Sequence, residues 1–417
     1  MATQPLNSAP IAFFLPALAG GGVEKNFLRL AGAFVAEGYA VDLVLTRAGG
    51  DYENAVPAGV TVHWLQPSGV LNSRWTVARN ARVPLAALLR PVLLPIKSSR
   101  NLRHVAALAD YLKTRRPQTL IAGMSYPNLV AIWARNRAGV DTRIVVTERN
   151  TLSQTIQRVH RKWRWRYLPA LLGPAYRQAD HVVAVSHGVA DDLATVTGLS
   201  RSAIRTIYNP VVSPAIAEQA ASAPNHAWFT PGQPPVILAA GRLTSAKRFD
   251  RLIRAFARVR QTSQARLLIL GEGRDRRALQ ALAREQGVAG DVAMPGFADN
   301  PYAFMAQAAV FVLSSDYEGL PTVLIEALAC GATVVATDCP SGPREILDGG
   351  RYGALVACED EAGLASAISA ALAAPADRDR QKARAEAFSL DESLRQYRTL
   401  CLDKSRSANK RKQGDRF

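Results

Sequence analysis

Short apolar runs rich in β-branched residues alternate with helix-like patterns, and this alternation occurs twice along the 417-residue chain. The first series contains IAFFLP, AVDLVL, TLIAG, RIVVT and HVVAVS, and the second contains VILAAG, LLILGEG, DVAMPG, VFVLSS and TVVATD. Such alternation is typical of βαβ units, which form a parallel sheet with helices on both faces. The sequence therefore predicts an α/β fold with two Rossmann-like domains facing a central cleft.

The limits of the two domains follow from where the alternation stops. A weakly patterned segment rich in Pro, Ala and Ser separates the two series, and we interpret residues 208–235 as a linker. It would join an N-terminal domain at 1–207 to a C-terminal domain at 236–385. Residues 386–403 predict a C-terminal helix, with a return to the N-terminal domain as one option, and 404–417 a basic disordered tail.

Composition restricts the partners and the compartment. The chain has 51 Lys and Arg against 34 Asp and Glu, a formal charge of +17, which favours phosphorylated substrates, nucleic acid or an anionic membrane face. Its four cysteines show no C-x-x-C spacing, which argues against a disulfide framework and a zinc site and favours a reducing cytoplasm. No run approaches the ~20 apolar residues of a membrane-spanning helix. We expect a soluble chain, or one attached to a membrane only at its surface.

Glycines follow the first predicted strand in LAGGGVEKNFLRL, where Gly21 and Gly22 precede a helix. Glycine lets the backbone approach a ligand closely, and free N–H groups at a helix start attract phosphate. The dinucleotide fingerprint G-x-G-x-x-G does not fit, because Lys25 stands where its third glycine is needed. The turn predicts a phosphate contact, with an ordinary structural turn as the alternative.

Two cations follow the first strand of the second series. In AAGRLTSAKRFD, Arg242 lies just beyond the strand and Lys247 five residues later. Two cations that converge on one diphosphate would stabilise a leaving group. Solvated surface charge is the alternative.

Two carboxylates, Glu318 and Glu326, are separated by seven residues in SSDYEGLPTVLIEALACG. Pro321 suits the first position of a helix that runs through Glu326 to about Cys330. At ~100° per residue, eight steps leave an offset of ~80°, so the carboxylates would not face each other even on one helix. We expect them to contact different parts of one long ligand rather than to form a hydrolytic pair around one bond.

These stretches together resemble the retaining glycosyltransferases of family 4, which have the GT-B fold. The resemblance extends through nearly the whole chain and includes the E-x7-E signature around Glu318 and Glu326. Its other pieces are GGGVEKN, AVSHGVADDL, IYNPV, GRLTSAKRFDRLIRAF, LLILGEGRDRRALQALA, MPGF and PSGPREILDGGRYGALV. The resemblance implies an N-terminal acceptor-binding domain and a C-terminal domain that binds a nucleotide sugar.

The resemblance also implies a role for each motif residue. Glu326 would hold the ribose hydroxyls, and Arg242 and Lys247 the diphosphate. The donor sugar would contact Glu318 and the backbone of Gly319, Leu320, Pro321 and Thr322. Gly21 and Gly22 would close on the phosphates, and Gly296 and Phe297 would line the base pocket. Neither a cofactor nor a metal is expected, because the two cations stabilise the departing charge; Asp377 and Asp379 predict a solvated helix face.

One loop departs from the family pattern. Many relatives carry a histidine after a mid-domain strand of the first half, whereas this chain reads VVTERNTLS, which puts an acid/base role for histidine in doubt. We interpret His187 as structural. The acceptor-side candidates are Ser125, Glu148, Arg149 and Asn150, with a turn role for Ser125 as the alternative.

The positive charge is concentrated in two segments of the first half. Residues 74–103 hold seven Lys or Arg and no acidic residue, and 158–167 mix cations with Trp and Tyr. Basic residues beside aromatics suit the headgroups of an anionic bilayer, with an ordinary solvated face as the alternative. We expect a peripheral enzyme on the inner face of the cell membrane, with a glycan or lipid-linked acceptor.

The family resemblance favours a UDP-sugar donor that supplies a hexose or N-acetylhexosamine for bacterial surface polysaccharide or lipopolysaccharide. A nucleotide-sugar epimerase of the same fold is one rival function. A basic nucleic-acid-binding or membrane-binding protein is the other, although no nucleic-acid motif is visible and we expect no nucleic-acid partner.

Overall fold

The computed structural model describes residues 9–19, 21–94, 99–158 and 163–402 of the chain. The chain divides into two compact units. The first unit consists of residues 1–210 together with 390–417, and the second of residues 211–389.

Within its described residues, the first unit is built on a sheet of seven parallel strands in the order β3-β2-β1-β4-β5-β6-β7. The residues of β1 and β2 are all buried, because apolar side chains point into both covered faces, as expected for a parallel sheet. The strands are β1 (Ile11–Leu15), β2 (Val41–Leu45), β3 (Val60–Trp64), β4 (Thr119–Gly123), β5 (Arg143–Glu148), β6 (His181–Ala184) and β7 (Ile204–Thr206).

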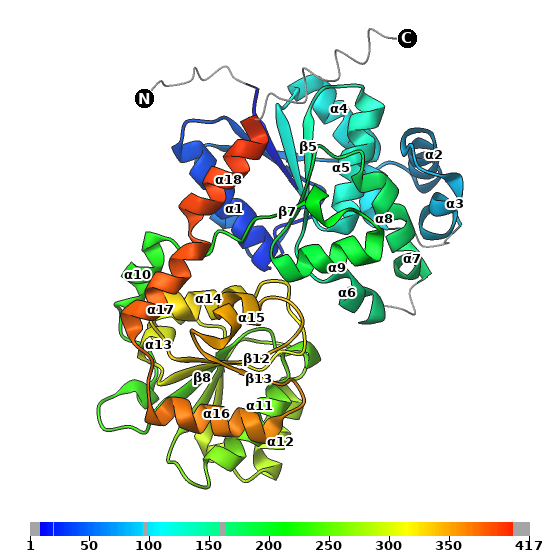
Figure 1. Cartoon of the computed structure of the whole chain (residues 1–417). Coiled ribbons are helices and arrows are strands. Elements are labelled where there is room, and N and C mark those ends of the chain that lie inside the picture. The colour runs from blue at the N-terminus through cyan, green and yellow to red at the C-terminus, as the bar shows by residue number, and fades with distance from the viewer. Residues whose placement is uncertain (1–8, 20, 95–98, 159–162, 403–417) are drawn as a thin grey trace. The chain divides into compact units, whose positions relative to one another are not determined.

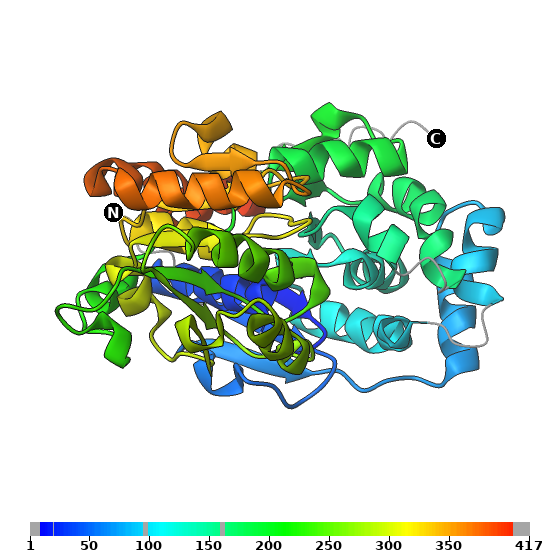
Figure 2. The ribbon, with the colours of Figure 1, turned by 90° about the horizontal axis from the view of Figure 1, so that it is seen from below.

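Helices cover the sheet of the first unit (Figures 1 and 2). They are α1 (Gly22–Ala36), α2 (Val70–Asn80), α3 (Leu85–Leu88), α4 (Val105–Arg115), α5 (Ser125–Ala138), α6 (Leu152–Arg158), α7 (Trp163–Arg166), α8 (Leu168–Tyr176), α9 (His187–Thr197) and α18 (Leu390–Leu402). Short helical turns are η1 (Glu53–Ala55), η2 (Leu89–Leu93), η3 (Arg100–His104) and η4 (Arg201–Ala203).

The last helix, α18, returns from the end of the chain to the first unit, where it packs on α1. Its Tyr397 and Leu400 are 1% exposed and join the apolar core around Phe13, Phe27 and Phe34. The Thr119 hydroxyl on β4 donates to the backbone oxygen of Cys401, at 3.1 Å. Buried apolar side chains therefore fix this distant segment to the first sheet.

The second unit repeats the architecture with six parallel strands among its residues, in the order β10-β9-β8-β11-β12-β13. The strands are β8 (Val236–Ala240), β9 (Arg266–Leu270), β10 (Val292–Gly296), β11 (Val310–Leu313), β12 (Val334–Thr337) and β13 (Ala354–Val356). Its helices are α10 (Pro214–Ala220), α11 (Phe249–Val259), α12 (Arg276–Glu285), α13 (Pro301–Gln307), α14 (Thr322–Ala329), α15 (Pro343–Ile346), α16 (Glu361–Ala373) and α17 (Arg378–Ala385). Its short turns are η5 (Ala227–Phe229), η6 (Ser245–Lys247), η7 (Ala289–Asp291), η8 (Asp348–Gly350) and η9 (Glu386–Phe388).

The predicted class of two Rossmann-like α/β domains is confirmed, while several limits differ from the prediction. Residues 208–235 are not a bare linker, since α10 and η5 lie there and α10 packs on α13 of the second unit. The units meet along the chain at Pro210 and Val211, and again at Ser389 and Leu390. The tail predicted at 404–417 lies outside the described residues. In the described part of the chain, no helix has the length and apolar character needed to span a membrane.

Candidate functional site

The strand order of the second unit reverses between β8 and β11, which are neighbours in the sheet. Open α/β sheets bind ligands at the carboxyl ends of the strands where the order reverses, because the two adjacent loops diverge there. The loop after β8 carries Arg242 and Lys247, and the loop after β11 carries Glu318. The sheet topology therefore brings these predicted residues to one edge.

Lys247 and Glu318 form a direct ion pair in this structure. The Lys247 Nζ lies 2.6 Å from Glu318 Oε1, and the Ser315 hydroxyl donates to the same oxygen at 2.7 Å. Both side chains are partly buried, with 22% of Lys247 and 14% of Glu318 exposed. Among the described residues, Glu318 Oε2 has no hydrogen-bond partner. One carboxylate oxygen is thus held in place, while the other can accept a hydrogen bond from a ligand.

Backbone contacts fasten the two loops to each other. The Ser314 hydroxyl donates to the backbone oxygen of Lys247 at 2.7 Å, and the Asp316 N–H donates to the Ala246 oxygen at 3.0 Å. The Thr337 hydroxyl on β12 supports the same loop by donating to the Ser315 oxygen at 2.6 Å. These bonds set the position of Lys247 relative to Glu318.

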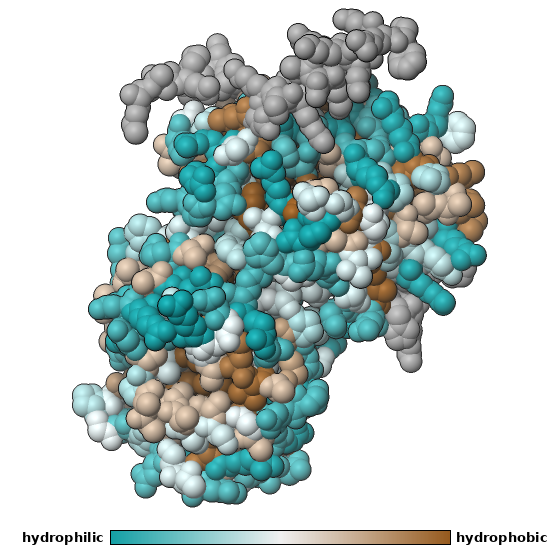
Figure 3. All heavy atoms as spheres, in the orientation of Figure 1, coloured by the Kyte–Doolittle hydropathy of each residue, from teal (hydrophilic) through white to brown (hydrophobic). Residues whose placement is uncertain are grey.

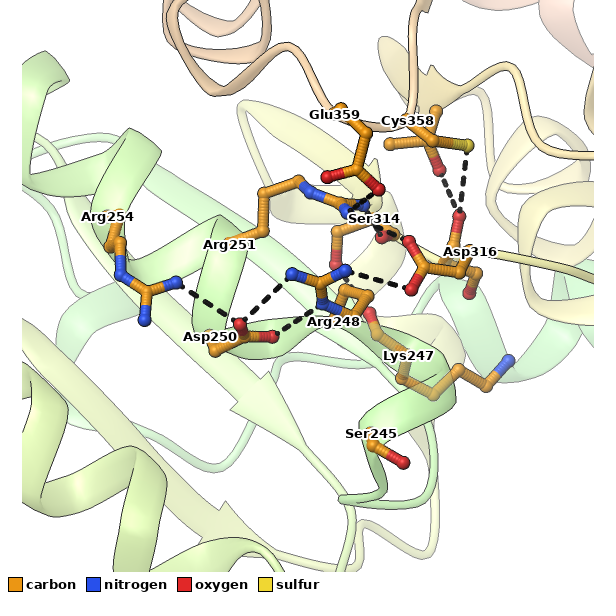
Figure 4. A network of polar contacts seen from close by, with 12 residues as sticks. Ser245, Lys247, Arg248, Asp250, Arg251, Arg254, Ser314, Asp316, Cys358 and Glu359 are labelled. Atoms are coloured by element: carbon orange, nitrogen blue, oxygen red, sulfur yellow. Dashed lines mark hydrogen bonds and ion pairs between the residues drawn. The ribbon is translucent and has the colours of Figure 1, made fainter. Parts of the chain in front are cut away.

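A network of charged side chains follows Lys247 in the chain and reaches the loop after β11 (Figure 4). The Arg248 guanidinium donates to Asp250 Oδ1 at 3.1 Å and to Asp316 Oδ2 at 2.9 Å. The buried Arg251 pairs with Asp316 Oδ1 at 2.8 Å and with Glu359 at 3.3 Å. Arginines of α11 and the turn before it therefore fix the loop that carries Glu318.

Two members of this network, Arg248 and Asp250, have pKa values shifted toward their charged forms. The hydrogen bond that Arg248 donates to Asp250 raises the pKa of Arg248 above its ordinary value. Burial acts to raise the pKa of Asp250, but hydrogen bonds from Arg248 and Arg254 outweigh it and lower that pKa. Arg248 and Asp250 thus stay ionised at neutral pH.

Glu326 lies in the second turn of α14, whereas Glu318 lies in the loop before this helix. Glu326 is 5% exposed, and the Tyr302 hydroxyl of α13 donates to its Oε1 at 3.2 Å. Helix α14 begins at Thr322, so the prediction of Pro321 as its first residue is wrong by one position; Pro321 is the N-cap. No side chain caps this helix start, which leaves N–H groups that can bind an anion or a hydroxyl oxygen.

The turn that precedes α14 is tightly supported. The Ser341 hydroxyl donates to the Gly319 oxygen at 2.8 Å, while Leu320 and Pro321 are buried. Gly342 has a φ of +97°, and a Cβ there would lie only 2.4 Å from the Pro321 Cδ. A glycine is therefore required at 342 for the 338–343 loop to approach the Glu318 loop.

The remaining predicted residues of the second unit lie on neighbouring loops. Arg242 is exposed, and its side chain makes no hydrogen bond or ion pair with a described residue. Gly296 ends β10 with a φ of +103°, and the Phe297 side chain that follows is 79% exposed. Phe297 thus presents an aromatic surface without burying it.

The first unit has its own reversal of strand order, between β1 and β4. Gly21 is the N-cap of α1 and Gly22 its first residue, directly after β1, and no side chain caps this helix. Glu24 lies in the first turn of the helix. The glycine turn and the uncapped helix start lie where the sequence predicts them, and the phosphate contact itself stays a prediction.

The loop after β4 has a strained backbone. Met124 has a φ of +76° and a ψ of 149°, a region that residues other than glycine rarely occupy. It is held there because its N–H donates to the Thr147 oxygen of β5 at 3.1 Å. The strain places Ser125 at the start of α5, and such outliers concentrate at functional sites.

Glu148 ends β5 and is 4% exposed. The Tyr176 hydroxyl donates to its Oε1, and the Asn128 amide lies 3.4 Å from the same oxygen and donates to the Tyr176 oxygen at 2.9 Å. Burial raises the pKa of Glu148 to about 7, although hydrogen bonds from Tyr176, Ser125 and Asn128 oppose it. Glu148 is therefore a buried group that exchanges a proton near neutral pH and touches Ser125.

The other acceptor-side candidates differ in exposure. Arg149 is 6% exposed and donates to Asn209 Oδ1 at 2.6 Å, with its guanidinium 4.5 Å from the Phe27 ring centroid. Its side chain is thus used inside the first unit, whereas Asn150 is exposed. His187 lies at the start of α9, where its Nδ1 is 3.0 Å from an Arg201 nitrogen, a contact consistent with a structural role.

Glu148→Gln should make the stability of the first unit less dependent on pH. The native pKa of about 7 exceeds the ordinary 4.5, so the native state binds more protons than the unfolded state between these values. The contribution of Glu148 to stability is therefore complete below pH 4.5 and lost as pH rises through 7. A pKa difference of about 2.5 corresponds to about 3 kcal/mol of free energy. The unfolding free energy of the variant, relative to wild type, should therefore be higher at pH 8 than at pH 5 by up to that amount.

Chemical unfolding at pH 5 and pH 8 checks this prediction. Glu386→Gln, on η9 of the second unit, is the control. In this variant, the change in unfolding free energy between pH 5 and pH 8 should equal that of wild type. An unfolding free energy that changes with pH equally in Glu148→Gln and wild type would contradict it.

Sequence reasoning missed the residues that hold the candidates in place. Ser315, Arg251 and Tyr302 contact Glu318, its loop and Glu326. The sequence signal for Arg251 is its place among the apolar residues of FDRLIRAF. The structure buries it to 2% exposure, where it needs a carboxylate partner, and that partner, Asp316, is 65 residues away in the sequence. Asp377 accepts from the Asp379 and Arg380 N–H groups and caps α17.

Comparison with known proteins gives two family matches that follow the two units. The family described as Glycosyltransferase Family 4 matches residues 20–213, and the family described as Glycosyl transferases group 1 matches residues 225–388. Together they span most of both units.

Individual relatives agree with these matches. The chain is 28% identical over 382 residues, 91% of its own length and 95% of the relative's, to N-acetylgalactosamine-N,N'-diacetylbacillosaminyl-diphospho-undecaprenol 4-alpha-N-acetylgalactosaminyltransferase of Campylobacter jejuni. Its fold is similar to the lipopolysaccharide outer core galactosyltransferase WaaB, with a TM-score of 0.68 and 21% identity over 94% of this chain and 98% of the other. It is also similar to Anabaena Alr3699/HepE in complex with UDP, with a TM-score of 0.68 and 18% identity. The match covers 93% of this chain and 98% of the Anabaena protein.

Proposed function

We propose that this chain, which belongs to the family 4 glycosyltransferases with the GT-B fold, transfers a hexose or N-acetylhexosamine from a nucleotide-diphosphate sugar to a glycan or lipid-linked acceptor. The observation that carries the proposal is the pair of loops at the strand-order reversal of the second unit. There Lys247 contacts Glu318, and α14 with Glu326 follows directly. A sugar nucleotide needs a cation for its diphosphate and carboxylates that accept hydrogen bonds from its sugar and ribose hydroxyls.

Each part of the donor is assigned to a group with suitable chemistry. Glu318 Oε2 accepts from a sugar hydroxyl, since Lys247 and Ser315 hold the other oxygen. The uncapped start of α14 binds the donor through its N–H groups. Glu326 accepts from the ribose hydroxyls, and the exposed ring of Phe297 with Gly296 contacts the base.

Transfer breaks the bond between the anomeric carbon and the diphosphate. Negative charge develops on the leaving diphosphate, and Arg242 and Lys247 stabilise it, usually the largest single contribution to catalysis. The acceptor hydroxyl attacks the anomeric carbon, and its proton passes to the departing diphosphate as the new glycosidic bond forms. We propose retention of configuration and no metal requirement, in line with two cations available for the leaving group.

The acceptor is assigned to the first unit, at the loops after β4 and β5. Ser125 and the exposed Asn150 supply hydrogen-bonding groups there, while the buried Glu148 holds Ser125 in place. The Campylobacter relative is named for an undecaprenol-linked acceptor, which supports a lipid-linked acceptor in bacterial surface-glycan or lipopolysaccharide assembly. Such an acceptor places the enzyme on the inner face of the cell membrane. The Anabaena neighbour was solved with UDP, which supports UDP over GDP.

UDP should raise the melting temperature of this protein, and EDTA should leave that rise unchanged. A ligand that binds only the native state stabilises it by about 2.7 kcal/mol at one hundred times its dissociation constant. A thermal-shift panel of UDP, GDP and their sugar conjugates, each with and without EDTA, measures both effects. UDP-sugars should then support transfer to lipid-linked glycan acceptors.

Other outcomes would overturn the proposal when oligonucleotides are added to the panel and the UDP-sugars are analysed for products. Stabilisation by oligonucleotides with none by any nucleotide diphosphate would indicate a nucleic-acid-binding protein. Conversion of a UDP-sugar into its epimer without an acceptor would indicate an epimerase. Loss of the UDP shift in EDTA would overturn metal independence alone.

A further inference from the structure

Helix α2 of the first unit exposes two large apolar side chains, although it buries Val77 and two polar ones. It buries the polar Ser73 and Thr76, at 2% and 3% exposure, while Leu71 and Trp75 are 81% and 63% exposed. Residues four apart lie on one helix face, so Leu71 and Trp75 form an outward apolar stripe. The Ser73 hydroxyl donates to the backbone oxygen of Val70 at 2.7 Å, so its hydrogen bond is made within the helix. A helix normally directs its apolar stripe to the core, so this stripe needs a partner.

A second stripe lies on the segment that follows. Leu88 and Val92 are buried and anchor α3 and η2, whereas Leu85 and Leu94 are each 61% exposed and Leu89 is 36% exposed. Helix α2 packs against η2, so the stripes belong to one surface, and Figure 3 shows hydrophobic residues gathered over this part of the first unit. We call this surface the apolar patch, which consists of Val70, Leu71, Trp75, Leu85, Leu89 and Leu94.

Arginines surround the apolar patch. Residues 70–94 contain four arginines and no acidic residue, and Arg79, Arg82 and Arg90 among them are exposed. The Arg79 guanidinium lies 5.4 Å from the Trp75 ring centroid. Exposed leucine and tryptophan beside cations match the interface of a bilayer, where apolar groups enter the acyl boundary and arginines meet anionic headgroups.

The fold adds the second basic segment to the same surface. Helix α7 packs on η2, and the Arg90 guanidinium lies 4.8 Å from the ring centroid of Tyr167. The predicted segments 74–103 and 158–167 are therefore neighbours, although parts of both, residues 95–98 and 159–162, lie outside the described residues. The described parts of the two segments therefore belong to one surface.

We propose that the apolar patch docks into the headgroup region of an anionic bilayer, with Leu71, Trp75 and Leu85 inserted and Arg79, Arg82 and Arg90 on lipid phosphates. This inference deepens the membrane-linked acceptor of the proposed function. A second copy of the chain fits this surface less well, because the patch would meet its own arginines and no acid of 70–94 would pair with them.

Vesicle sedimentation tests the docking surface without an assay of transfer. The full-length protein should sediment with phosphatidylglycerol-containing vesicles and much less with phosphatidylcholine vesicles. Leu71→Ser/Trp75→Ser should lower the vesicle partition coefficient about tenfold or more, because two inserted side chains are lost. Arg79→Gln/Arg82→Gln should lower it about fivefold for each charge.

Matched variants make the result specific. Arg277→Gln/Arg284→Gln removes two exposed charges from α12 of the second unit and should bind vesicles like wild type. Trp75→Phe should keep binding, yet show less quenching of tryptophan fluorescence by brominated lipids. All variants should keep the wild-type melting temperature and UDP shift, which separates failure of this inference from failure of the proposed function.

Three results would overturn the inference. The wild-type protein could fail to sediment with anionic vesicles, or Leu71→Ser/Trp75→Ser could bind them as tightly as wild type. The third is a dimer in sedimentation velocity that Leu71→Ser/Trp75→Ser converts to a monomer, which would assign the apolar patch to a second copy of the chain.

Discussion

Lys247→Ala is expected to lower kcat/KM for sugar transfer by about 10² to 10³-fold. Loss of one preorganised group that stabilises developing negative charge has an effect of this size. Lys247 suits that role because its Nζ lies 2.6 Å from Glu318 Oε1 and three-quarters of its side chain is shielded from water. The fall should be larger in kcat than in the reciprocal of KM, since the charge on the leaving diphosphate grows in the transition state. Initial rates of UDP release with an acceptor present measure both constants.

The control for Lys247 is Lys382→Ala, which removes a half-exposed lysine from α17 of the same unit, 3.7 Å from Asp379. It should leave both constants within experimental error, since surface ion pairs contribute little. Lys247→Arg keeps the charge and should restore part of the activity. Because Ser315 still donates to Glu318 in Lys247→Ala, the melting temperature should change little. Wild-type kcat/KM in a folded Lys247→Ala protein would exclude Lys247 from the leaving-group site.

Glu326→Ala is expected to raise the dissociation constant of UDP by about 10²-fold or more. A hydrogen bond to a charged acceptor contributes ~1.5 to 3 kcal/mol, and the proposed carboxylate accepts from two ribose hydroxyls. Its position is fixed by the Tyr302 hydroxyl at 3.2 Å, so little reorganisation is required for binding. Isothermal titration of UDP into wild type and variant measures the change.

The ribose supplies the decisive control for Glu326. Dideoxy-UDP lacks both hydroxyls, so it should bind wild type about as weakly as UDP binds Glu326→Ala. The two deletions should not add, because they remove the same contact from opposite sides. Full additivity would place Glu326 away from the ribose. Glu285→Ala, on α12 of the same unit, should bind UDP like wild type.

The fold was predictable because its signal is local. Strands such as β1, β4 and β8 are buried along their whole length, so their apolar runs are continuous in the sequence. The prediction omitted β3, β7 and β13. These three strands lie at sheet edges and are short or partly exposed. Their side chains carry a mixed pattern, since one or both faces are open to solvent.

The candidate site was predictable only in its residue types. Arg242, Lys247, Glu318 and Glu326 follow strands, and strand ends are where α/β sheets bind ligands. The sequence left open which of them touch. The structure joins Lys247 to Glu318, leaves Arg242 exposed, and turns Arg149 inward onto Phe27. Whether a cation faces a ligand or the core depends on packing by residues far away in the chain.

The sequence by itself determined two α/β domains, the loops that carry the charged residues, and the position of the positive charge in the first half. Only the tertiary structure decided that β8 and β11 are neighbours where the strand order reverses, which pairs Lys247 with Glu318 across 71 positions. It also decided that α2 directs Leu71 and Trp75 to solvent and that η2 meets α7. The physical reason is that apolar periodicity specifies which side chains prefer burial, whereas strand order and helix facing follow from how all the buried surfaces fit together.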